Sequence, residues 1–521
     1  GSGTDGYIKT ITLADDGALT PITVIEHDDS YGIYNSIVKV DGTLYALAYT
    51  GPSSYGYIKT FYISDDGSTI ETKGISAHDN STTMWNSLVQ VDANTVALAY
   101  DSNNPAGGII KTFDVSSAGA VITQTQALEH NVSFGLTNSF IKMDAETYAL
   151  AYSGHGWDGY ISTFTIPADG SSITEVDEIE HNTSFAQHNS FVQVDHNTYA
   201  LAYYGSDGGN YGLIQTFTIP LNGYGITEVA SLKHETNSNT GTYNSFIKLN
   251  SGQYALAYTG YESDGYLKIF TISSDGAAIA EQGSLEYDKN YGTWNELIVI
   301  DKNTCALAYS GDGYDGFIKT FDIAAVDAAG PTYAIDIAAD NDNVSVVFNE
   351  PVYSTNAASG TLTASDFSLS VNGGSASVSG SPTGIAASSG YIFTLGLDLS
   401  GTPDGTEVLT VDLANAVYDA NGNAASSSQD NNTVNLNEKV PPTVTATTLA
   451  AYNTTINVTF SEAVFASYNS GTGVASGSLE ADDFVFSMSG GDAALASTTP
   501  SSISTASFSN CLLYTSDAAD E

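Results

Sequence analysis

Short apolar runs alternate with polar turns through the first 323 residues, and the pattern repeats at a fixed interval. The clearest marker is the tetrapeptide Ala-Leu-Ala-Tyr, whose final tyrosine falls at residues 49, 100, 152, 203, 258 and 309. The intervals are therefore 51, 52, 51, 55 and 51 residues. A period near 50 residues is typical of solenoids, propellers and other repeat arrays.

Each period contains four strand-like pieces and no helical pattern. In one repeat, piece A is Asp158–Ile166, piece B is Ile173–His181, piece C is Asn189–Asp195 and piece D is Thr198–Tyr203. Short turns, often Asp-Gly, join A to B, and this is a strong hairpin signal. Two hairpins per repeat predict a four-stranded β-propeller blade. Piece D is the most apolar and piece B the most polar, so we expect the order C-D-A-B with B outermost.

The number of pieces predicts the number of blades. Piece A occurs seven times, whereas pieces B, C and D each occur six times. The chain opens inside a repeat, because GSGTDGY at residues 1–7 matches SGHGWDGY at residues 153–160. We therefore expect part of a longer, multidomain chain, with a propeller over residues 1–326. A seven-bladed ring with an incomplete first blade fits best, and a six-bladed ring closed by residues 6–27 is the alternative.

The repeat stops after residue 323, and residues 324–332 are typical of a linker. Two related segments follow: VSVVFNEPV at 344–352 parallels INVTFSEAV at 456–464, and LTASDF at 362–367 parallels LEADDF at 479–484. With VYDANGNA at 417–424, these motifs resemble the SbsA-type bacterial Ig-like domains of S-layer and surface proteins. The resemblance implies an Ig-like β-sandwich at 331–438 and a second, truncated one at 441–510, both acting as spacers.

Residues 511–521 (CLLYTSDAADE) break abruptly with the Ser/Thr-rich sequence before them. Their first six residues match a reading frame through a transposon-type sequencing adapter. They resemble translated adapter read-through, so we expect 511–521 to be a non-native tail and leave it out of the fold prediction. Cys305 is then the only native cysteine, and no disulfide framework is expected.

The balance of charged residues excludes some classes of binding partner. The chain has 13 Lys+Arg, all of them lysine, against 59 Asp+Glu, for a net charge of −46. Nucleic acids and anionic membranes both require basic patches, so neither is expected as a partner. No apolar run is long enough for membrane insertion. Without arginine, the chain also lacks bidentate clamps for carboxylates and phosphates.

The loop from piece B to piece C carries the sharpest repeated constellation. Five repeats place histidine at one position, and Tyr287 stands there in the sixth: the histidines are His27, His78, His130, His181 and His234. All six repeats place asparagine at another position: Asn35, Asn86, Asn138, Asn189, Asn244 and Asn295. Because these residues recur in nearly every blade, we interpret them as repeat-structural. Asparagine would then cap backbone groups and histidine would bond a neighbouring blade.

The residue before each asparagine varies, and we call this position the slot. The slot residues are Tyr34, Trp85, Thr137, His188, Tyr243 and Trp294. Aromatic faces stack on sugar rings, so the ligand-binding candidates are Tyr34, Trp85, His188, Tyr243 and Trp294, joined by His155 and Trp157 from a D-to-A loop. The expected ligand is a neutral glycan or a protein.

Metal and catalytic motifs are weaker. Asp419, Asn421 and Asn423 place oxygen ligands at alternate positions, like half of a calcium loop, although Gly422 equally suits a plain turn. Calcium is the one cofactor suggested. SDDGST at 64–69 resembles a sialidase Asp-box imperfectly, and the absence of arginine argues against that activity. No catalytic set breaks the repeat, so an enzyme is the less favoured interpretation.

Three functions remain open from the sequence. The leading hypothesis is a secreted or cell-surface propeller for adhesion or ligand capture, carried on Ig-like modules. The second is a propeller hydrolase or lyase acting on polysaccharide. The third is a purely structural surface-layer or stalk component.

Overall fold

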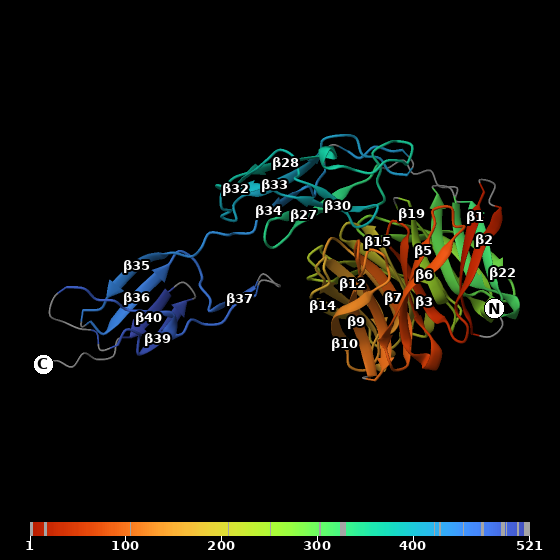
Figure 1. The fold of residues 1–521 in the computed structure, drawn as a ribbon, viewed down its shortest axis with the longest axis horizontal. Coiled ribbons are helices and arrows are strands. Elements are labelled where there is room, and N and C mark those ends of the chain that lie inside the picture. Colours follow the sequence, from red (N-terminus) through yellow and green to blue (C-terminus); the bar gives the residue numbers. More distant parts are fainter. Residues whose placement is uncertain are drawn as a thin grey trace.

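The computed structural model shows an all-β chain in which a propeller is followed by two smaller β domains (Figure 1). It describes residues 4–514 except 15–17, 105, 207, 251, 302–303, 323–329, 421, 427–428, 452, 470–473, 491–494, 496 and 508–509.

Seven antiparallel sheets make up the propeller. The first holds β1 (Gly6–Leu13) and β2 (Leu19–Asp28). Five whole blades follow: β3 (Ile33–Asp41), β4 (Leu44–Thr50), β5 (Gly56–Ile63) and β6 (Ile70–Asp79); β7 (Thr83–Asp92), β8 (Thr95–Asn103), β9 (Ala106–Val115) and β10 (Ile122–Asn131); β11 (Leu136–Lys142), β12 (Thr147–Ser153), β13 (Gly159–Thr165) and β14 (Thr174–Asn182); β15 (Ala186–Asp195), β16 (Thr198–Ser206), β17 (Asn210–Thr218) and β18 (Thr227–Glu235); β19 (Thr242–Asn250), β20 (Gln253–Thr259), β21 (Gly265–Ile272) and β22 (Ile279–Asp288). The last sheet holds β23 (Thr293–Asp301), β24 (Thr304–Ser310) and β25 (Gly316–Asp322).

The predicted blade order is confirmed. Every whole blade runs C-D-A-B, as in β3-β4-β5-β6, with the Ala-Leu-Ala-Tyr strand between its two neighbours. Strands of type C contact one another from blade to blade and so are innermost. Strands β1 and β2 form a sheet of their own and do not join β23–β25, so seven sheet positions are present and the six-bladed alternative is not realised.

Blades pack through two chemically different faces. One face of each sheet carries the two alanines of Ala-Leu-Ala-Tyr and an isoleucine or leucine of strand A, and we call it the alanine face. The opposite face, the aromatic face, carries the leucine and tyrosine of the same motif with a phenylalanine. In one interface Ala149, Ala151 and Ile161 pack against Phe191 and Leu201 of the next blade. Small residues meeting large ones let twisted sheets interdigitate closely.

A repeated hydrogen bond between neighbouring blades stabilises this packing near the turns from A to B. A threonine of strand A donates to the carbonyl of the turn glycine in the next blade, at 2.5–2.8 Å in five interfaces: Thr10 to Gly67, Thr60 to Gly119, Thr112 to Gly170, Thr163 to Gly223 and Thr216 to Gly276. The turn glycines have positive φ, as the Asp-Gly signal predicts. The turn therefore also connects blades, which hairpin geometry alone does not reveal.

The first C-terminal domain is a β-sandwich built from a four-stranded, a three-stranded and a two-stranded sheet around a continuous apolar core. Its strands are β26 (Tyr333–Ile337), β27 (Asn343–Phe348), β28 (Phe367–Asn372), β29 (Ser377–Val378), β30 (Ile385–Ala387), β31 (Ile392–Gly396), β32 (Leu399–Ser400), β33 (Val408–Leu413) and β34 (Thr433–Asn435). The second domain has β35 (Val444–Leu449), β36 (Thr455–Phe460), β37 (Ser467–Asn469), β38 (Val474–Ser476), β39 (Ser502–Ser507) and β40 (Asn510–Tyr514). Strand β40 lies between β36 and β39, so residues 511–514, which we expected to belong to a non-native tail, are placed within the second domain's sheet.

The first sandwich contacts the propeller at the pole where the strands of type C end and where strands A turn into strands B. The backbone N–H of Ala145 donates to Ser345 Oγ at 3.3 Å, and Lys248 Nζ donates to the carbonyl of Asn349. Leu221 joins an apolar cluster with sandwich residues that include Val347. The opposite pole, where each C strand begins, carries the slot residues. Among the described residues, no helix is long and apolar enough to cross a membrane.

Candidate functional site

The six slot residues share an unusual backbone conformation. Each sits on a bulge near the start of an inner strand, where pairing with strand D skips two residues. Their φ values lie between 50° and 57°, in the left-handed region. Non-glycine residues rarely adopt this region, and bulges often re-aim a side chain. The repetition in all six blades shows that the bulge belongs to the architecture of the repeat.

The bulges bring five aromatic side chains from five blades together, and we call this group the aromatic cluster. Its ring-centroid distances are 4.9 Å for Tyr34–Trp85, 4.4 Å for His188–Tyr243 and 4.7 Å for Tyr243–Trp294. Trp85 and Trp294, which lie on non-adjacent blades, stack at 5.9 Å. Contacts between side chains of non-adjacent blades require these side chains to converge on the propeller axis. Trp294 is 50% exposed, so the cluster presents an aromatic surface to solvent.

The asparagine after each slot ties one blade to the next. Its Nδ2 donates to the carbonyl of the slot residue in the preceding blade, at 3.0–3.2 Å: Asn86 to Tyr34, Asn138 to Trp85, Asn189 to Thr137, Asn244 to His188 and Asn295 to Tyr243. Asn35, in the first complete blade, bonds its own loop at Gly32 instead. Each of the other five bonds connects the side chain of one blade to the backbone of the preceding blade.

The aromatic cluster is electrically neutral near pH 7. Burial lowers the pKa of His188 to about 4, so its ring is uncharged. Burial also raises the pKa of Tyr34 and of Tyr243, which keeps both hydroxyls protonated. Such a surface suits a ligand without charge.

One carboxyl group lies next to the cluster. The residue after the asparagine is serine in five blades, and its Oγ accepts a backbone N–H of the next blade at 2.8–3.1 Å. Glu296 replaces this serine in the last blade. Surrounding protein raises the pKa of Glu296 to about 7, although its side chain keeps contact with solvent.

The five repeat histidines are packing residues. Each ring stacks edge-on against a motif tyrosine, as His130 does against Tyr152 at 4.6 Å. It also covers a strand-A glycine, where a Cβ on Gly108 would lie 2.4 Å from the His130 ring. The expected hydrogen bond to a neighbouring blade is absent among the described residues, since both ring nitrogens of all five lack a partner. Burial leads the causes that lower their pKa values to about 3 or 4.

Trp157 and His155 belong to a second aromatic group at the same pole. They lie on the short 3-10 helix η2 (His155–Trp157), between β12 and β13. Trp157 is 44% exposed and stacks with Phe134 at 6.0 Å and with Phe185 at 6.3 Å. His155 Nδ1 lies 3.2 Å from Ser133 Oγ. The ring contacts of Trp157 in the described chain therefore do not include the aromatic cluster.

The calcium candidate shows turn geometry. Both carboxylate oxygens of Asp419 accept hydrogen bonds from Asn423, one from its N–H and one from its Nδ2, each at 2.8 Å. Gly422 has φ +83°, as the alternative interpretation requires. Asn421 lies outside the described residues. Within the part of the chain that the structure describes, no three His, Cys, Asp or Glu are grouped to hold a metal ion.

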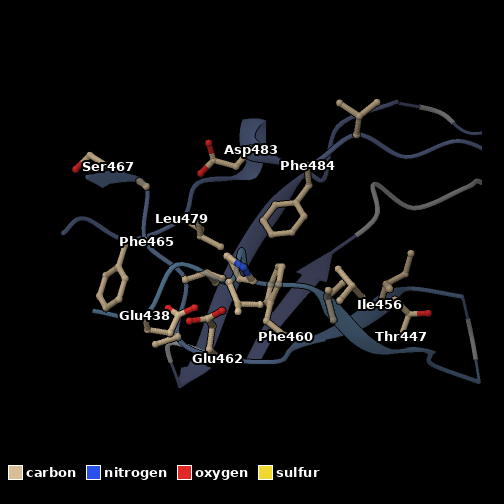
Figure 2. Close-up of a pocket in the computed structure, with 18 of the residues that line it drawn as sticks. Glu438, Thr447, Ile456, Phe460, Glu462, Phe465, Ser467, Leu479, Asp483 and Phe484 are labelled. Carbon is tan, nitrogen blue, oxygen red and sulfur yellow. The ribbon is translucent and has the colours of Figure 1, made fainter. Parts of the chain in front are cut away.

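A large cavity, about 1250 Å³, lies in the second sandwich rather than the propeller (Figure 2). Phe460 and Phe484 face into it. Their counterparts in the first sandwich, Phe348 and Phe367, are buried in a closed core. We therefore interpret the cavity as an incompletely covered core and not as a ligand site.

No family model and no curated protein matches the sequence. Solved structures resemble it in fold alone. A hypothetical selenium-binding protein from Sulfolobus tokodaii is 9% identical, with 62% of this chain and 85% of that chain covered at a TM-score of 0.47. A periplasmic gluconolactonase from Pseudomonas aeruginosa is 11% identical (62% and 96%, TM-score 0.46), and an α-L-arabinanase from Penicillium chrysogenum is 10% identical (57% and 94%, TM-score 0.37). At these values the similarity does not indicate a function.

Proposed function

We propose that this protein is an extracellular or cell-surface binding module that captures a neutral glycan on the aromatic cluster. The observation that carries the proposal is the convergence of five uncharged aromatic side chains, from five blades, at one pole, where Trp294 is exposed and the other four are half-buried. Clustered tryptophan and tyrosine provide large, rigid contact area, and they are the residue types that dominate binding energy at interfaces.

The chemistry of the chain favours a neutral ligand over an acidic one. A net charge of −46 repels anions, and without arginine no side chain can grip a carboxylate or sulfate bidentately. Sugar rings offer C–H faces for the aromatic rings and hydroxyls for polar neighbours, so a neutral glycan fits both properties.

The residues beside the aromatic cluster favour a binding function over hydrolysis. Glycoside hydrolases generally place two carboxyl groups about 5–10 Å apart across the scissile bond. The positions that follow the asparagines are serine in five blades, and only Glu296 is acidic there. One carboxyl group at these positions does not supply the acid and base that hydrolysis requires.

The sandwich domains fit the role of a spacer, as their SbsA-type resemblance implies. The first one contacts the pole opposite the aromatic cluster, through residues such as Ala145 and Lys248. This placement supports presentation of the cluster away from the attachment side.

A panel of neutral and acidic glycans, screened with calcium and with chelator, tests the proposal. We expect saturable binding to a neutral glycan, weakened at least about tenfold (about 1.4 kcal/mol) by Trp85→Ala and by Trp294→Ala. Tyr224→Ala is the matched control, because Tyr224 is 69% exposed in the turn between β17 and β18 at the opposite pole. A silent panel, or equal binding by all three variants, would contradict the proposal.

A further inference from the structure

The alanine face of the last sheet is uncovered. Ile318 on β25 is 38% exposed and Ile298 on β23 is 52% exposed. The residues equivalent to Ile318 in four whole blades are fully buried by the next blade: Ile58, Ile110, Ile161 and Ile214, each at 0%. The surface that closes every other interface therefore faces solvent here.

The facing surface on β3 is exposed in the same way. Ile37 is 47% exposed, whereas its equivalents in the following blades are at most 6% exposed: Leu88, Phe140, Phe191, Phe246 and Leu297. Two complementary apolar surfaces, one from each end of the blade series, thus border one space.

An open strand edge lies beside this space. Strand β1 has the sequence of a strand A, and in whole blades strand A pairs on both sides, as β5 pairs with β4 and β6. Among the described residues, β1 pairs with β2 alone. Its second edge therefore presents backbone N–H and C=O groups that can accept another strand.

We propose that this space is a docking site for a two-stranded β-hairpin with the repeat's own C and D pattern, as in β19–β20. The second strand of the hairpin would extend the sheet of β1 by antiparallel pairing. Its aromatic face would cover Ile298 and Ile318, and its alanine face would cover Ile37. Two strands are required because a whole blade has four and β1–β2 provides two.

Continuity with the existing interfaces selects this occupant. Every other alanine face in the described propeller packs against an aromatic face, in five successive interfaces. A small apolar ligand could cover the isoleucines but would leave the β1 edge without partners. A single strand could pair with β1 but would not supply both faces at the inner position.

A synthetic peptide of residues 242–259, fluorescently labelled and added to the full chain, tests the proposal. We expect one peptide to bind per chain, and we expect Ile318→Asp to weaken binding at least about tenfold by placing a charge in the apolar contact. Ile75→Asp is the matched control, since Ile75 is 58% exposed on the outer strand β6. A Leu256→Asp peptide should bind as poorly as the protein variant does.

Fusion of the same hairpin to Gly1 through a flexible linker covers the case in which the free peptide does not fold. The fusion should raise the melting temperature, and Ile318→Asp should abolish the gain. Absence of both binding and stabilisation, or equal effects in Ile318→Asp and Ile75→Asp, would overturn the proposal. A concentration-dependent dimer that Ile318→Asp dissociates would assign the site to a second copy and would overturn the hairpin as its occupant.

Discussion

The buried histidines should make the propeller sensitive to acid, and His130 is the clearest case. Its ring is 8% exposed, both ring nitrogens lack partners in the described chain, and burial alone lowers its pKa to about 3. In the unfolded chain the same histidine has a pKa near 6.5. Between these values the unfolded state binds a proton that the folded state does not, so stability falls as the pH falls below about 6.5.

The size of the effect follows from proton linkage. Each pH unit below 6.5 costs about 1.4 kcal/mol per histidine, so lowering the pH from 7 to 5 removes about 2 kcal/mol at His130. Five histidines with pKa values of about 3 or 4 share this environment. Together they could remove roughly 10 kcal/mol, which is comparable to the entire stability of a typical domain.

Carboxyl groups whose pKa is raised act in the opposite direction, so the measurement has to isolate the histidine. Burial raises the pKa of Asp101 to about 6, and protonation of such groups favours the folded state as the pH falls. His130→Tyr removes only the histidine contribution, because the repeat itself uses Tyr287 at this position, edge-on against Tyr309 at 4.9 Å. The difference between variant and parent then reports one proton.

Urea unfolding followed by tryptophan fluorescence is the appropriate assay, since Trp85, Trp157 and Trp294 all lie in the propeller. Between pH 7 and pH 5 the His130→Tyr protein should lose about 2 kcal/mol less than the parent does. His155→Gln, at an exposed site on η2, is the control and should follow the parent. Parallel curves for His130→Tyr and the parent would refute the reasoning, because they would mean that the ring is charged in the folded protein.

Three further experiments test packing and hydrogen bonds, the first two with variants at matched positions. Gly159→Ala should destabilise the propeller by several kcal/mol, since its Cβ would lie 2.5 Å from the His181 ring, whereas Gly316→Ala meets nothing within 4 Å and should be neutral in thermal unfolding. Asn138→Ala should lower the melting temperature more than Asn35→Ala, since Asn138 bonds the preceding blade and Asn35 bonds only its own loop. Burial opposes ionisation of Glu407, but hydrogen bonds from four backbone N–H groups outweigh burial and hold its pKa at about 2. The ionised Glu407 therefore stabilises the folded first sandwich, and this contribution should be lost as the pH falls from about 4.5 towards 2. In Glu407→Gln, the stability of the first sandwich, measured by hydrogen exchange, should depend less on pH in this acidic range.

The sequence predicts the blade order and blade number because both depend on counting. A motif such as Ala-Leu-Ala-Tyr, repeated every 51–55 residues, specifies which strand is covered on both sides. The seventh copy of piece A favours seven sheets, and the separate β1–β2 sheet then excludes the six-bladed alternative. The convergence of Trp85 and Trp294 was harder to predict. It depends on a bulge with positive φ, and tyrosine or tryptophan in a strand pattern gives no signal for that conformation.

Other features could not be predicted because they join residues that are distant in the sequence. The bond from Thr163 to the carbonyl of Gly223 joins a strand of one blade to a turn of the next, and the local pattern explains the strand and the turn separately. The histidines were expected to bond a neighbouring blade, yet His130 packs on Gly108 and Tyr152 without a bond to its ring nitrogens among the described residues. Every repeat that has the histidine also has a glycine at the start of strand A, and in the sixth repeat Tyr287 faces Gly265. Only this pairing could have indicated that the histidine ring packs on the glycine.

The hydrogen-bond pattern explains why the slot is free to vary. The bond that each asparagine makes to the preceding blade uses the carbonyl of the slot residue, and the slot side chain takes no part at Tyr34, Trp85, His188 or Tyr243. Tyrosine, tryptophan and histidine therefore satisfy the blade contact equally. Only at Thr137 does the slot side chain also accept from the asparagine, at 3.0 Å from Asn189. The backbone carbonyl at this position makes the contact that stabilises the fold. The slot side chains can therefore change without disturbing the fold. In each repeat, the groups that stabilise the propeller are thus distinct from the side chains that are available for binding.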